Sequence, residues 1–60
     1  MMLTAYVKTA GDHHFLLGIE ELPGVEAVAI SVRDIPAAVQ AAAAAHTGHP
    51  KEYFTVAVDY

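Results

Sequence analysis

The fold of this chain is decided at residues 20–24, which read Glu-Glu-Leu-Pro-Gly. The stretch follows an apolar run at residues 13–19. Proline fixes φ and donates no backbone hydrogen bond, and the glycine after it readily takes a positive φ. We therefore expect the chain to reverse at Pro23 and Gly24 and to begin a new strand at Val25.

The length and composition of the chain bound its architecture. It has 60 residues, enough for one domain, which we place at residues 1–60. A chain this short buries only about 60% of the surface that its unfolded form exposes, so a monomer has little stability. The chain has no cysteine for a disulfide or thiolate metal site, yet 55% of its residues are hydrophobic, against about 45–50% in typical soluble domains. This combination predicts a homo-oligomer, most simply a two-fold dimer.

The charge balance restricts the partners. The formal net charge is −4, with only three basic residues. Direct binding of nucleic acid needs clustered Lys or Arg, so we expect none, and the acidic balance favours a cationic partner. No apolar run approaches the about 18 residues of a membrane span, and no basic region precedes the first apolar residues. We expect a cytoplasmic protein without a membrane span or signal peptide.

Four segments have the composition of strands. Residues 3–9 alternate between apolar and polar side chains, the pattern of a half-buried strand. A turn at residues 10–12 precedes a second strand at 13–20, which is apolar on both faces near its middle. We expect a third strand at residues 25–30 and a last strand at 52–59.

One helix is predicted between the third and fourth strands. Residues 41–45 are five alanines, the residue with the highest helix propensity. Ser31 and Asp34 have the spacing of a capping box, but Pro36 fits the first turn better if Asp34 is the N-cap. The sequence leaves both starts open. The helix then ends near residue 46, and Gly48 is suited to a left-handed C-terminal position.

Together these elements predict an α+β fold of order β-β-β-α-β, an antiparallel sheet with one helix packed on one face. The other sheet face is left open, and it is too apolar to remain fully solvated. We expect this open face to mediate self-association through four side chains: Tyr6, Leu16, Tyr53 and Ala57.

The order of elements, with Glu-Leu-Pro-Gly between the second and third strands, resembles the HicB family of antitoxins. The similarity covers nearly the whole chain. Residues 12–24 match the family's turn, aromatic strand and Glu-Leu-Pro-Gly signature, with Phe15 at an aromatic position. Ser31 stands seven residues after Gly24, where the family has a helix-capping threonine, and Asp34 supplies the acid of the capping box. The resemblance implies a partial, degenerate ribonuclease-H-like fold in a short form without the DNA-binding domain of longer members.

The residues that carry chemistry do not form a recognisable catalytic or metal site. The histidines at positions 13 and 14 are adjacent, so in a strand they point to opposite faces, whereas zinc needs three or four converging ligands. A ribonuclease-H site needs an acid in the first strand, and residues 3–9 contain none. We therefore expect no enzyme, no catalytic residue, no metal and no cofactor.

The resemblance implies a partner, a HicA-type toxin, which is a small basic protein that cleaves RNA. An acidic chain covers such a surface by charge complementarity. We expect the contact at the sheet edge and the acidic strand end, at Asp12, Glu20 and Glu21. The alternative is a phage or mobile-element protein that binds a host protein or assembles with itself and has no toxin partner.

Overall fold

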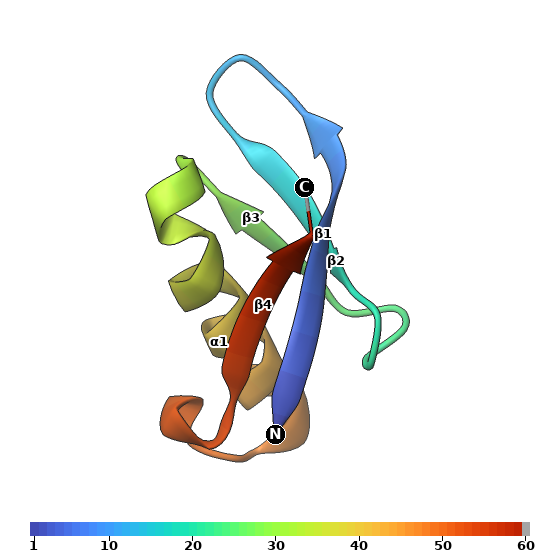
Figure 1. Cartoon of the computed structure of the whole chain (residues 1–60), viewed down its shortest axis with the longest axis vertical. Helices are drawn as coiled ribbons and strands as arrows, with labels where there is room; N and C mark the ends of the chain where they lie inside the picture. The colour runs from blue at the N-terminus through green and yellow to red at the C-terminus, as the bar shows by residue number, and fades with distance from the viewer. Residues whose placement is uncertain (60) are drawn as a thin grey trace.

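The computed structural model describes residues 1–59; the last position of the predicted domain, residue 60, lies outside them. The elements are β1 (Met2–Ala10), β2 (Phe15–Ile19), β3 (Glu26–Ala29), the short 3-10 helix η1 (Val32–Asp34), α1 (Ile35–Thr47), a second 3-10 helix η2 (Lys51–Tyr53) and β4 (Thr55–Asp59). The predicted α+β class and the order β-β-β-α-β are confirmed, with one helix against one face of the sheet (Figure 1).

The sheet is mixed rather than wholly antiparallel. Its strand order is β3-β2-β1-β4. β2 is antiparallel to both β1 and β3, but β4 lies beside β1 and parallel to it, with Leu3 opposite Val56 and Ala5 opposite Val58. The prediction of an antiparallel sheet is therefore wrong at β4, and the path of the helix explains why. At about 1.5 Å per residue, 13 residues of helix return the chain to the end of the sheet where β3 began, so β4 must run in the direction of β3 and β1.

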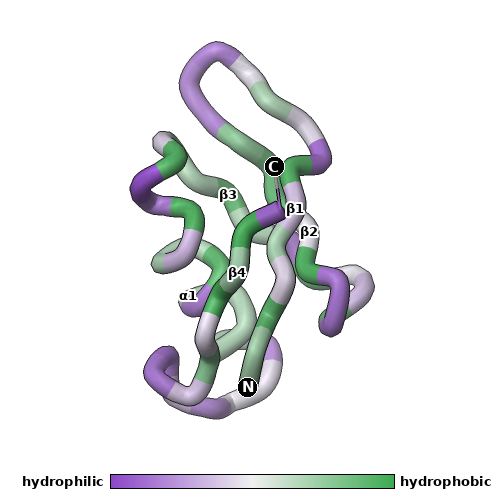
Figure 2. Tube along the Cα trace, viewed as in Figure 1, coloured by the Kyte–Doolittle hydropathy of each residue, from purple (hydrophilic) through white to green (hydrophobic). Residues whose placement is uncertain are grey.

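The β1–β2 hairpin projects beyond the rest of the molecule (Figure 1). The Gly11 N–H donates to the carbonyl of His14 at 2.8 Å, which closes the loop, and β2 begins at Phe15 rather than at residue 13. The pairing shifts register between Val7 and Thr9, so the hairpin contains a bulge at Lys8. Figure 2 shows that the hairpin loop and the loop after β2 are hydrophilic, whereas the strands are largely hydrophobic.

The Pro-Gly turn has the predicted geometry. The Val25 N–H donates to the Leu22 carbonyl at 3.1 Å, and Gly24 has a φ of 89°. Proline at the second position and a positive φ at the third are the features of a type II turn. This turn delivers the chain into β3.

The helix begins in the second of the two predicted ways. Ser31 starts η1 and Asp34 is the N-cap of α1, which places Pro36 in the first turn. The capping box itself is not formed, because the Ser31 hydroxyl donates to the Asp34 carboxylate at 3.0 Å instead of accepting from a backbone amide. Gly48 ends the helix with a φ of 83°, and its N–H donates to the Ala44 carbonyl at 2.8 Å.

The core lies between α1 and the covered face of the sheet. Its buried members are Leu3, Ala5, Leu17, Ile19, Ala27, Ala29, Ile35, Val39, Ala43 and Phe54. Ala43 lies in the alanine run and is 0% exposed, which shows that the small side chains let the helix lie close to the strands.

The segment before β4 differs from the predicted strand at 52–59. Residues 51–53 form η2, and β4 begins only at Thr55. The ring of Tyr53 stacks on His49 with ring centroids 4.3 Å apart, and it meets Phe54 edge to face at 5.1 Å. Tyr53 therefore lies beside the chain between the helix and β4, and it does not join the open sheet face.

Candidate functional site: the open face of the sheet

The sheet face opposite α1 is the surface on which functional side chains gather. Because side chains alternate along a strand, the residues between the buried positions point away from the helix. They are Met2, Thr4, Tyr6 and, at the bulge, both Lys8 and Thr9 of β1, Leu16 and Gly18 of β2, Glu26 and Val28 of β3, and Thr55, Ala57 and Asp59 of β4. Of the predicted self-association residues, Tyr6, Leu16 and Ala57 lie on this face.

The centre of the open face is already covered by Tyr6. Tyr6 pairs with Gly18 across β1 and β2, and a Cβ on Gly18 would lie 2.6 Å from the Tyr6 hydroxyl and 2.8 Å from its Cε2 atom. The ring thus occupies the space above the glycine, and Tyr6 remains only 38% exposed. Gly18 is in the strand because the ring needs that space.

A salt bridge lies beside this ring. The Lys8 ammonium is 2.7 Å from the Glu26 carboxylate, so the pair reaches from β1 to β3 over the strand between them. The hydrogen bond to Glu26, together with its charge, raises the pKa of Lys8. Both side chains stay partly exposed, and exposed pairs contribute little stability. Their effect is to neutralise the only charge that β3 carries.

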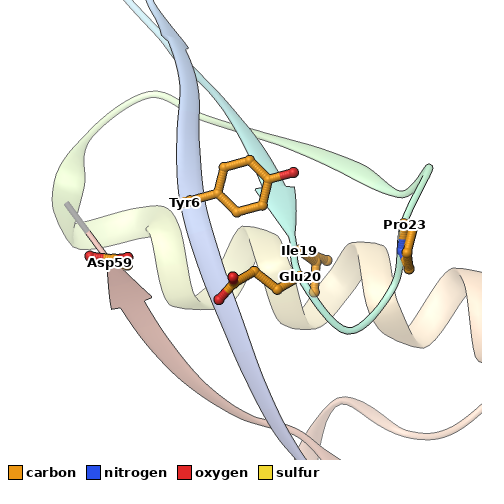
Figure 3. A pocket seen from close by; sticks show the side chains of 5 residues that line it. All are labelled: Tyr6, Ile19, Glu20, Pro23 and Asp59. Carbon is orange, nitrogen blue, oxygen red and sulfur yellow. The ribbon is translucent and has the colours of Figure 1, made fainter.

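An open hollow of about 410 Å³ lies at the end of β2 and β4. Its lining residues are Tyr6, Ile19, Glu20, Pro23 and Asp59, and we call it the acidic hollow. Figure 3 shows the ring of Tyr6 extending from β1 over β2, while the Glu20 carboxylate points back from the end of β2 towards β1. The hollow combines an aromatic ring, two carboxylates and two apolar walls. That chemistry suits a cationic side chain, which pairs with carboxylates and is attracted to aromatic rings.

Glu21 has an internal role. Its carboxylate accepts from the Thr4 backbone N–H at 2.6 Å and from the Thr4 hydroxyl at 3.0 Å, while the Glu20 N–H donates to the Thr4 carbonyl at 2.9 Å. The side chain thereby extends the β1–β2 ladder past the end of β2. The hydrogen bond from the Thr4 backbone lowers the pKa of Glu21, and the carboxylate is tied to the fold rather than offered to a partner.

The three acids predicted to contact a partner do not form one surface. Asp12 lies in the loop at the hairpin tip, and Glu20 and Glu21 follow the opposite end of β2. At about 3.3 Å per residue, the strand and its flanking residues place more than 20 Å between the two ends. Nor is β2 at a sheet edge, since the edges are β3 and β4. Of the three, Glu20 alone lines the hollow, where it joins Asp59, a residue that the sequence did not single out.

Three exposed apolar side chains gather at and just after the β3 edge. Val28 is 59% exposed, Ile30 is 76% exposed and Val32 is 49% exposed; we call these three residues the β3 patch. The sequence predicted a third strand at residues 25–30, but only the strand order shows that β3 is at the edge.

Metal-binding groups do not converge in the part of the chain that the structure describes: residues 1–59 contain no cluster of three or more His, Cys, Asp or Glu side chains placed to hold an ion. Within the same residues no helix is long and apolar enough to cross a membrane. Comparisons with family models, with curated proteins and with solved structures found no match to this chain.

Proposed function

We propose that this chain is a non-catalytic, cytoplasmic protein-binding module that acts as a homodimer and holds a small basic protein. The proposal takes its partner class from the resemblance to HicB-like antitoxins, whose toxins are basic proteins that cleave RNA. The net charge of −4 supports it, because an acidic surface attracts and orients a basic partner.

The acidic hollow is the observation that carries the proposal. Asp59 lies on β4 and Glu20 directly follows β2, the two strands that flank β1, and both carboxylates line the hollow together with the ring of Tyr6. A lysine or arginine of the partner that enters the hollow meets two carboxylates and one aromatic ring. Hydrogen bonds to charged groups contribute about 1.5–3 kcal/mol each, so losing both carboxylates should weaken the complex by about a hundredfold or more.

Affinity capture with matched variants tests this proposal. The tagged chain is used as bait in its source cells beside Glu20→Gln/Asp59→Asn and a control, Asp12→Asn/Glu52→Gln, that removes two charges outside the hollow. We expect the wild type and the control to retain one small basic protein that cleaves RNA, and the purified chain to suppress that cleavage. The hollow variant should lose both effects.

Two results would contradict the proposal. One is the absence of any basic partner. The other is a partner that the hollow variant retains as well as the wild type does.

A second candidate function is self-assembly without a toxin, as in a phage or mobile-element interaction protein. The exposed β3 patch favours it, because apolar side chains at a sheet edge promote association between copies. The two functions separate in the capture experiment: self-assembly alone predicts that the bait retains only further copies of itself and inhibits no RNA cleavage.

A further inference from the structure

β3 is one of the two edge strands of the sheet, and its side that faces away from β2 is open to another strand. β3 pairs with β2 alone, and residues 26–30 make no other backbone hydrogen bond with the described residues. The backbone stays extended as far as Ser31, whose φ is −155° and ψ is 162°. Along about six residues of extended chain, the backbone donors and acceptors that point away from β2 are therefore unused.

This edge lacks the features that keep edge strands apart. Soluble proteins protect edges with lysine, proline, bulges or inward-pointing charges. Residues 27–30 read Ala-Val-Ala-Ile, and the charge of Glu26 is already neutralised by Lys8. Next to the edge lies the β3 patch, with Ile30 at 76% exposure.

We propose that a second copy of this chain pairs antiparallel along β3, with Ala29 on the two-fold axis, so that two four-stranded sheets become one continuous sheet. The inference rests on the self-association proposed above and names its surface and register. Identical strands in antiparallel pairing form an isologous contact, in which each copy uses the same residues.

The register follows from the side chains on the open face. Opposed residues in an antiparallel pair lie on the same face, so even-numbered residues of β3 must oppose even-numbered residues of its copy. With Ala29 on the axis, Val28 of each copy lies beside Ile30 of the other. Glu26 of each copy then lies at the end of the pairing, where the other copy leaves the strand after Ser31 and enters η1 with Arg33, for which the described residues include no ion-pair partner.

The two neighbouring registers are less favourable. With Val28 on the axis, each Ile30 faces the carboxylate of Glu26. With Ile30 on the axis, each Val28 would oppose position 32, which already belongs to η1, so fewer extended residues could pair. Of these three registers, the one centred on Ala29 opposes Val28 with Ile30 within the extended residues, and apolar cross-strand pairs of this kind stabilise a sheet.

Cysteine cross-linking tests both the surface and the register, because the chain has no native cysteine. Opposed residues have Cα atoms about 4.5–5.5 Å apart, within the range that a disulfide spans. The variants are Val28→Cys, Ile30→Cys and a control at the other sheet edge, Ala57→Cys. All three sites are exposed, and circular dichroism checks that each variant is folded.

We expect a cross-linked dimer when Val28→Cys and Ile30→Cys are mixed and oxidised, and none from either variant alone or from the control. Cross-linking of Val28→Cys alone, or of the control, would overturn the proposal. If sedimentation shows a wild-type dimer and the mixture does not cross-link, the β3 interface is refuted while self-association stands. If the wild type is a monomer, both the β3 interface and self-association are refuted.

Discussion

Tyr6 covers Gly18 from the neighbouring strand, and its ring takes the space in which any larger residue at position 18 would place its side chain. The Tyr6 hydroxyl would lie 2.6 Å from a Cβ at that position. The ring shields the backbone of the glycine and forms one wall of the acidic hollow. A glycine that weakens a strand by itself is here compensated by an aromatic side chain on the opposed residue.

Gly18→Ala should therefore act through Tyr6. The new methyl group displaces the ring, and we expect a loss of about 1 kcal/mol in the free energy of unfolding, as for other overpacked sites. The Tyr6→Ala variant has no ring to displace. Adding Gly18→Ala to it should therefore reduce the free energy of unfolding much less. Urea unfolding of the two single variants and the double variant measures this coupling, and simple additivity of the two losses would contradict it.

Acid should weaken the fold through Glu21. The hydrogen bond from Thr4 lowers its pKa, so the folded state holds a proton less readily than the unfolded state. The stabilisation is present above the ordinary carboxyl pKa of about 4.3 and is lost as the pH falls through the lower folded-state pKa. Glu21→Gln should have a lower melting temperature than the wild type at pH 7, and a smaller further decrease between pH 5 and 3.

The control for this measurement is Glu52→Gln. Glu52 is exposed, and its side chain makes no hydrogen bond to the residues that the structure describes. The melting temperature of the control should depend on pH in the same way as that of the wild type. If the melting temperature of Glu21→Gln also matches the wild type at every pH, the hydrogen bond from Thr4 does not contribute to stability.

The helix terminus offers a test of backbone strain. Gly48 has a φ of 83°, and a Cβ there would meet no atom within 4 Å, so the left-handed backbone alone opposes a substitution. Gly48→Ala should cost about 1 kcal/mol of unfolding free energy. Asparagine tolerates this conformation better, so Gly48→Asn should cost less than Gly48→Ala. If thermal melts show that Gly48→Ala and Gly48→Asn lose equal stability, backbone strain at this position is not the cause of the loss.

The sequence predicted local features well because each depends on a few neighbouring residues. The Pro23–Gly24 reversal, the helix with Pro36 in its first turn and the Gly48 terminus follow from the φ angles that these residues allow. Alternation likewise identified the first strand as half-buried. It says nothing about strand direction, so the parallel pairing of β4 with β1 had to come from the path of the helix.

The candidate site was harder to predict because it depends on contacts between strands. Nothing local to Tyr6 indicates that its ring covers Gly18, and nothing local to Glu21 indicates that Thr4 binds its carboxylate. The same limit explains why Tyr53, which stacks on His49, was assigned to the open face, and why the β3 patch was missed. An edge strand is identified only when the whole strand order is known.

Sedimentation velocity at micromolar concentration tests the central claim most directly, with the wild type, Ile30→Lys and the matched control Ala57→Lys compared. Both positions are exposed, on opposite edge strands of the sheet. We expect a dimer for the wild type and for Ala57→Lys, and a folded monomer for Ile30→Lys, because the interface between two copies of Ile30→Lys would have to bury two ammonium groups. The wild-type melting temperature should also rise with protein concentration. A well-folded wild-type monomer, with a melting temperature unchanged by dilution, would contradict the account.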